Sequence, residues 1–217
     1  MGHRVLVLLA LLGGIARADG RVAGKVTITD SAGRPVSADA IVYVVGPVEK
    51  PDPADKPQVA QQGKQFVPDL VAVTAGGSVA FPNHDAFLHN VFSQSPERQF
   101  DLGSFRKGET KSKDFRTPGV VDVYCNIHPE MAATILVLPN RLHTHVKADG
   151  SFVLEHVPAG TWTVFAYTRR ALRPVSAKVT VTNGADATVN LALVRGAEPE
   201  HLNKYGEKYH EPGATYR

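Results

Sequence analysis

One short stretch of the sequence gathers three side chains that can bind a metal ion. Cys125, His128 and Met131 lie within seven residues of one another, between two runs of apolar and β-branched residues that are typical of strands. A loop between adjacent strands can turn a thiolate, an imidazole and a thioether towards one point. A further imidazole from a neighbouring strand would complete the set, and His89, in a predicted strand over 88–92, is the candidate.

These donor types select the metal. Two imidazoles and one thiolate in a plane, with a weak thioether on the axis, describe a type 1 (blue) copper site that transfers electrons. Zinc would fill its fourth position with His, Cys, a carboxylate or water, and iron–sulfur clusters need more thiolates than the single cysteine supplies. The sequence therefore predicts one copper ion bound by His89, Cys125, His128 and Met131.

Each ligand also has a simpler interpretation. Cys125 could be a buried core cysteine, and Met131 could fill a gap in the core. His89 could be a strand histidine with a hydrogen-bond partner, although the Asn-Val that follows it favours a ligand. Cys125 and His128 could form a nucleophile pair, although the members of such pairs usually lie far apart in sequence. We expect no enzyme activity and predict no catalytic residue.

Residues next to the ligands in the sequence are predicted to hold the ligands in place. We expect the backbone N–H of Asn90 to bond the Cys125 sulfur and its side chain to brace the loop. Phe87, Pro129 and Ala132 are expected to form an apolar rim around the exposed edge of His128.

The remaining histidines have weaker claims to a function. His84 lies in a predicted loop and is expected to face solvent. His143 and His145 are two positions apart, so on a strand they share one face, but two imidazoles alone make a weak metal site.

Bulk composition predicts an all-β protein. The chain has 217 residues, of which 43% are hydrophobic, 19 are Gly and 15 are Pro, and it contains strand-like runs but no long amphipathic helical pattern. We expect two β-sandwiches. The predicted parts are a signal peptide (1–18), N-terminal strands with a Pro-rich linker (19–60), a metal-binding domain (61–139), a second sandwich (140–196) and a polar tail (197–217). The first strands could belong to the second sandwich.

The first residues resemble an export signal. His3 and Arg4 precede an apolar run over 5–15, and residues 16–18 (Ala-Arg-Ala) fit the signal peptidase pattern. An uncleaved membrane anchor is the alternative. Cleavage gives a periplasmic protein with no membrane span. Because the removed segment carries Arg4 and Arg17 and no acid, the formal charge of +3 falls to about +1, which gives no basis for nucleic-acid binding.

The ligand motifs resemble those of a known family. His89-Asn90-Val91 and the Cys-x-x-His-x-x-Met spacing of 125–131 are similar to the motifs of plastocyanin/azurin-type cupredoxins, and the short spacing is most similar to that of amicyanin. Residues 81–85 and 100–103 also resemble cupredoxin-like methylamine-utilisation proteins. The resemblance covers about 61–139 and implies a Greek-key β-sandwich that transfers single electrons.

The flanking segments resemble a different module. Residues 24–26 and 40–42, together with 149–152 and 157–162, are similar to a carboxypeptidase regulatory-like (transthyretin-like) β-sandwich. The cupredoxin part is then either inserted in that sandwich or follows its first strand pair.

These observations favour a periplasmic electron carrier. Its redox partner would be a c-type cytochrome or a membrane redox complex. A copper-binding or copper-storage protein, or a cell-envelope interaction module without electron transfer, is the alternative.

Overall fold

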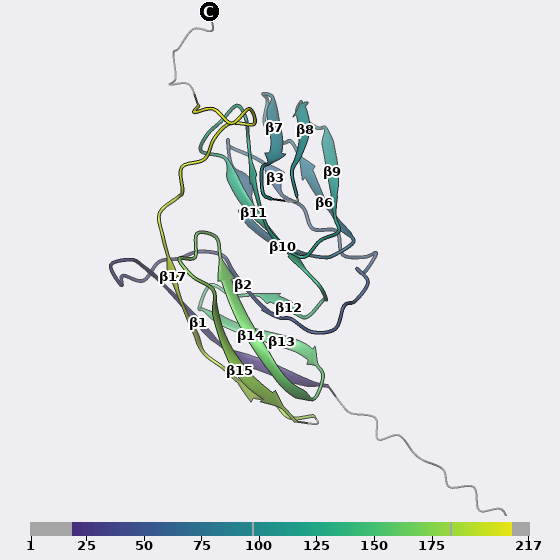
Figure 1. Ribbon diagram of the computed structural model, residues 1–217, viewed down its shortest axis with the longest axis vertical. Helices are drawn as coiled ribbons and strands as arrows, with labels where there is room; N and C mark the ends of the chain where they lie inside the picture. Colours follow the sequence, from purple (N-terminus) through teal and green to yellow (C-terminus); the bar gives the residue numbers. More distant parts are fainter. Residues whose placement is uncertain (1–18, 97, 183, 210–217) are drawn as a thin grey trace, which may run out of the picture.

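The chain folds into two β-sandwiches joined side by side (Figure 1). The computed structural model describes residues 19–96, 98–182 and 184–209, and within these ranges every regular element is a strand. This confirms the predicted all-β class. The predicted signal peptide at 1–18 and the end of the predicted tail at 210–217 lie outside the described residues.

We call the sandwich that the middle of the sequence forms, strands β3 to β11, the inner sandwich, and the one formed by the two flanking parts the outer sandwich. The main sheet of the inner sandwich has the order β5-β11-β10-β7-β8, and the pairs β6-β9 and β3-β4 complete this sandwich. The strands are β3 (Ala60–Gln61), β4 (Phe66–Val67), β5 (Leu70–Thr74), β6 (Gly77–Pro82), β7 (His89–Ser93), β8 (Phe100–Phe105), β9 (Thr110–Phe115), β10 (Gly119–Tyr124) and β11 (Ala132–Leu138).

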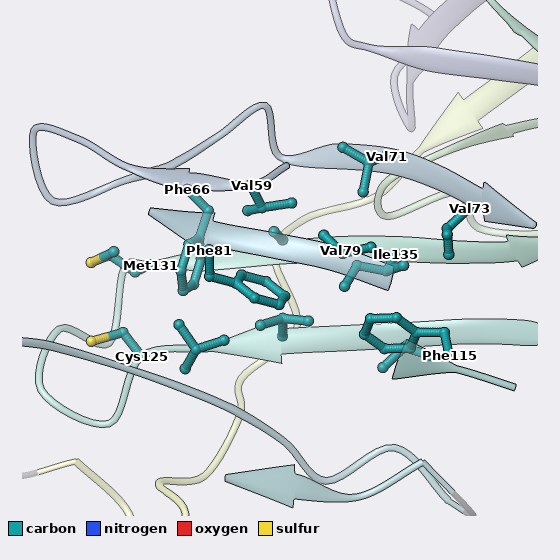
Figure 2. Packing of buried hydrophobic residues seen from close by; sticks show 14 of the residues in the cluster. Val59, Phe66, Val71, Val73, Val79, Phe81, Phe115, Cys125, Met131 and Ile135 are labelled. Carbon is teal, nitrogen blue, oxygen red and sulfur yellow. The ribbon is translucent and has the colours of Figure 1, made fainter. Parts of the chain in front are cut away.

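A single apolar core fills the inner sandwich. Phe81 of β6 and Ile135 of β11 are fully buried in it, and Phe115 of β9 closes one end (Figure 2). Val121 and Val123 of β10 point into this core because alternate residues of a strand face the same side. Cys125 and Met131 belong to the same cluster, so two of the predicted ligands are held in a rigid, closely packed interior.

Strand β11 is buried on both faces. Ile135 and its alternate neighbours face the inner core, while Leu136 and Leu138 pack with Ile41 and Leu70 in a second cluster. The nearly uninterrupted apolar sequence of β11 therefore reflects burial by the inner core on one side and by the outer sandwich on the other.

The outer sandwich combines strands from both ends of the chain. One sheet holds β13, β1 and β16 with β17 also paired to β1, and the other has the order β12-β2-β14-β15. The strands are β1 (Gly20–Asp30), β2 (Ala40–Val44), β12 (His143–His145), β13 (Ser151–Val157), β14 (Gly160–Thr168), β15 (Val175–Val181), β16 (Ala187–Thr188) and β17 (Leu191–Arg195). Strand β1 runs antiparallel to β13 and parallel to β17.

Two segments differ from the sequence-based expectation. The sequence of residues 66–74 resembles one strand, but Pro68 has no backbone N–H for a ladder, and the segment is divided into β4 and β5. Strand β8 had no clear sequence signal, since Asp101, Gly103 and Ser104 have low strand propensity.

Within the described ranges, the structure contains no helix with the length and apolar content that a membrane span requires.

Candidate metal centre

Three neighbouring strand ends bring the predicted ligands together. His89 is the first residue of β7, Cys125 directly follows β10, and Met131 directly precedes β11. Strand β10 pairs antiparallel with both β7 and β11, so these ends lie at the same edge of the sheet. The Cys125 N–H donates to the Met131 carbonyl at 3.2 Å and the Met131 N–H to the His128 carbonyl at 3.1 Å, which closes the loop.

The nitrogen and sulfur donors converge on one point. The Nδ1 atoms of His89 and His128 lie 3.1 Å apart, and Cys125 Sγ lies 3.9 Å from the first and 3.8 Å from the second. A point equidistant from these atoms is about 2.1 Å from each, within the roughly 2.0 to 2.3 Å of imidazole and thiolate bonds to zinc. This is the group in the described part of the chain whose donor atoms could hold a metal ion.

Met131 is the fourth predicted donor. Its side chain is fully buried, and its sulfur and that of Cys125 point out of the same end of the inner core (Figure 2). Of the two interpretations drawn from the sequence, the position at the mouth of the core beside Cys125 favours the axial ligand over a core gap-filler. Its bond to a metal stays a prediction.

The chemistry of the donors fits copper. Two imidazole nitrogens, one thiolate and one weak thioether form the donor set of a type 1 copper site. Burial lowers the pKa of His128 below its ordinary 6.5, and the nearby His89 lowers it further. The His128 ring is therefore neutral at neutral pH, the form in which an imidazole nitrogen can bind a metal.

The Cys125 sulfur is buried and surrounded by backbone amides. Burial raises the pKa of the thiol above its ordinary 9.0, and hydrogen bonds from the backbone N–H groups of Asn90, Ile127 and His128 oppose that rise. The Ile127 amide lies 3.4 Å from Sγ. Because the bound form is the thiolate, metal binding must displace the Cys125 proton near neutral pH.

Asn90 has the bracing role that the sequence predicted. Its side-chain oxygen accepts from the Asn126 N–H at 3.4 Å, and its amide nitrogen donates to Asp101 at 2.7 Å. The strand that carries His89 is thus tied to the loop that carries Cys125.

Asp85 is a site residue that sequence reasoning missed. Its carboxylate lies 2.8 Å from Nε2 of the fully buried His89. The N–H groups of Gly63 and Lys64 donate to the two Asp85 oxygens at 2.8 and 3.0 Å and hold the carboxylate in place. An Nε2–H that donates to Asp85 leaves the His89 Nδ1 atom unprotonated and aimed at the metal point.

The electrostatics keep Asp85 ionised. Partial burial raises the pKa of Asp85, but the hydrogen bonds from Lys64, His89 and Gly63 together outweigh it, so the pKa lies below its ordinary 3.8. A carboxylate on the far nitrogen increases the basicity of a histidine ligand. The spacing of Asp85 and His89, four residues apart, was visible in the sequence, but the hairpin that orients the carboxylate was not.

Replacing Asp85 with asparagine is expected to weaken Cu(II) binding by about 10- to 100-fold, the usual cost of losing a partner that orients a ligand. The variant keeps the shape of the side chain and removes its charge. Titration against a competing Cu(II) chelator measures the change. Glu130→Gln is the matched control, because Glu130 is an exposed carboxylate on the ligand loop with no bond to His89. Equal effects of both variants would contradict the specific role of Asp85.

An apolar surface surrounds the exposed part of the centre. His128 is partly exposed, and Phe87 (43% exposed) and Ile127 (46% exposed) flank it, with ring centroids of Phe87 and His128 5.6 Å apart. The predicted rim is correct for Phe87 and for the exposed Pro129 but wrong for Ala132. Ala132 begins β11 and is 8% exposed, because the sheet covers it.

The other histidines lie apart from the centre. His84 is exposed, as expected. His143 and His145 both lie on β12, and neither joins a group of three or more His, Cys, Asp or Glu donors in the described ranges.

Comparison with known proteins extends these observations. No protein-family model matches the chain. Amicyanin-alpha of Methylorubrum extorquens is 32% identical over 88 residues, which make up 39% of this chain and 74% of that protein. Plastocyanin of Ulva arasakii is 36% identical over 72 residues, 29% of this chain and 74% of that protein.

Solved structures give matches of the same kind. Amicyanin from Paracoccus versutus is 26% identical with a TM-score of 0.37, over 44% of this chain and 96% of that one. A purple cupredoxin from Nitrosopumilus maritimus is 20% identical with a TM-score of 0.34, over 37% of this chain and 98% of that one. These comparisons do not bear on the carboxypeptidase regulatory-like resemblance, which stays a prediction. The identity to amicyanin-alpha across most of that protein shows that this chain, over the matched part of its length, belongs to the cupredoxin family.

Proposed function

We propose that the chain is a type 1 copper protein that carries single electrons between redox partners in the periplasm. The observation that supports this most is the convergence of two imidazole Nδ1 atoms and one thiol sulfur on a single point. In this proposal His89, Cys125, His128 and Met131 are the ligands. In keeping with its cupredoxin relatives, the chain has no predicted catalytic residue and no proposed enzyme activity.

The protein's contribution is to hold the donors still. Bound copper would supply a reversible one-electron couple. His89 is fixed by Asp85, Cys125 by backbone amides and Met131 by the core, so three of the four donors have little freedom to move. Fixed donors keep the rearrangement between oxidation states small, which favours fast electron transfer.

The exposed ring edge of His128 is the proposed exit for the electron. The side chains beside it, Phe87 and Ile127, are 43% and 46% exposed and form an apolar surface next to a ligand. Such a surface fits a partner with an apolar docking face. A c-type cytochrome or a membrane redox complex is the proposed partner.

The proposal also covers location and domain organisation. The pattern of residues 1–18 supports export to the periplasm. We propose that the metal-binding domain at 61–139 is inserted in a carboxypeptidase regulatory-like sandwich. The pairing of β1 and β2 with strands that follow residue 139 supports an insertion.

Reconstitution of the exported, full-length protein with Cu(II) tests the function. One equivalent of copper is expected to produce intense visible absorption from thiolate-to-copper charge transfer. Rapid mixing with a reduced c-type cytochrome then measures electron transfer. A protein that stays colourless contradicts the copper site, and slow transfer with freely exchangeable copper contradicts the carrier and supports storage. The mass of the exported protein shows whether cleavage occurs before Asp19.

A further inference from the structure

The chain after β17 leaves the outer sandwich and crosses to the metal end of the inner one (Figure 1). We call residues 198–209 the tail segment. The sequence predicted that this polar stretch would lie extended along the surface or be partly disordered. Its contacts are more specific than that, because they concentrate on the two residues on either side of Cys125 and on Cys125 itself.

The tail segment bonds directly to the ligand loop. The Tyr209 hydroxyl donates to the backbone carbonyl of Cys125 at 2.9 Å. The Lys204 N–H donates to the side-chain oxygen of Asn126 at 2.9 Å. Each bond joins the tail segment to a residue more than 75 positions earlier in the chain. Both of these residues directly follow the end of β10.

Aromatic stacking covers the residue before the thiol. The ring of His201 lies parallel to that of Tyr124, with centroids 3.9 Å apart, and Tyr209 packs edge-on against His201 at 5.3 Å. Burial lowers the pKa of His201, so the ring stacks in its neutral form. The stack covers part of the Tyr124 ring, next to Cys125 in the chain.

A closed ring of hydrogen bonds links the tail segment to both ligand-bearing strands. Lys204 Nζ lies 2.8 Å from Asp101, which accepts from Asn90, and Asn90 in turn accepts from Asn126. Because Lys204 also bonds Asn126, these four residues form one circuit around the start of β7 and the end of β10. Networks of this kind restrict all their members together.

The other end of the tail segment is anchored in the outer sandwich. Glu198 forms ion pairs with Arg169 and with Arg170, the latter at 2.6 Å, directly after β14. Arg169 is only 6% exposed. A partly buried pair of this geometry holds the base of the segment more firmly than an exposed pair would.

We propose that the tail segment is a clasp whose residues Tyr209, Lys204 and His201 position the Cys125–Asn126 part of the ligand loop and slow the release of the metal. This inference rests on the proposed copper site but not on electron transfer. Metal and tail segment restrict the same loop, so each lowers the conformational cost of binding the other. The coupling is reciprocal: bound copper must stabilise the docked tail segment by the same factor by which the docked tail segment stabilises copper.

Graded removal of the clasp tests this. A chain that ends at Glu198 keeps the side chain of both arginine pairs and loses the contacts of His201, Lys204 and Tyr209 to the ligand loop. It is expected to release copper to an excess of chelator at least about tenfold faster. Tyr209→Phe removes a single hydrogen bond and is expected to accelerate release by about two- to tenfold, the range that one such bond is worth. The variant Tyr43→Phe, at a ring that stacks on Phe165 in the outer sandwich, is the matched control and is expected to match the full chain.

The second measurement does not depend on release. Hydrogen exchange at the Lys204 amide, compared with and without copper, is expected to slow when the metal is bound, which a purely structural tail would not show. Equal release rates in all variants, or exchange at Lys204 that ignores copper, would overturn the clasp. If the chain that ends at Glu198 does not fold, the comparison of release rates between Tyr209→Phe and Tyr43→Phe decides alone. A full chain that takes up no copper instead overturns the proposed function.

Discussion

Replacing Cys125 with serine is expected to abolish the visible charge-transfer band of the Cu(II)-loaded protein. A serine hydroxyl stays protonated at neutral pH and gives no sulfur orbital from which an electron can pass to copper. Copper affinity should also fall by more than the roughly 10- to 100-fold that the loss of a ligand's outer partner costs. Absorption and electron paramagnetic resonance spectra of the loaded variant measure the first change, and titration against a competing Cu(II) chelator measures the second.

The control for this substitution is His84→Ala, since His84 is an exposed imidazole outside the centre. That variant should keep the full band. A Cys125→Ser protein with an unchanged spectrum would show that the thiol is not a ligand, and that Cys125 is the buried core cysteine of the simpler interpretation.

Phe81→Ala is expected to destabilise the metal-free protein by about 3–5 kcal/mol, the usual cost of emptying a fully buried phenylalanine site. Phe81 is 0% exposed and lies in the same apolar cluster as Cys125 and Met131. Urea unfolding of the metal-free protein gives the change in free energy. Copper should then recover part of the loss, because a ligand that binds only the folded state stabilises it by mass action.

Phe152→Ala is the matched substitution in the outer sandwich, where Phe152 is 1% exposed. It should cost a similar free energy of unfolding but leave copper retention close to that of the unaltered protein. A cost below about 1 kcal/mol for Phe81→Ala, or an equal loss of copper retention in both variants, would contradict the picture of the inner core as the platform of the site.

The centre itself could be predicted largely from the sequence. Cys125, His128 and Met131 lie in one short loop, so their spacing in the sequence is enough to predict that these side chains lie close together. His89 needed one further step, the assumption that its strand neighbours the loop, and the pairing of β7 with β10 confirms that assumption.

Contacts made between distant segments could not be predicted in this way. Asp85 meets His89 in an orientation set by the amides of Gly63 and Lys64, which belong to a hairpin twenty residues earlier. The polar composition of 198–209 likewise indicated exposure, whereas His201 and Tyr209 dock through ring faces and a single hydroxyl. The average polarity of a segment does not predict a small number of specific side-chain contacts of this kind.

The pairing of β1 with β17 imposes a sequence of events on folding. The inner sandwich is built from one continuous stretch, so it can close as soon as that stretch has left the ribosome. The outer sandwich has to join Lys25 to Asn190, which are 165 positions apart, and such long-range pairing is slow. A folded inner sandwich shortens the effective loop between β2 and β12, because it holds its own two ends close together. The metal-binding unit would then be a template that must form first. Strand β1, at the beginning of the chain, would pair with β17 last.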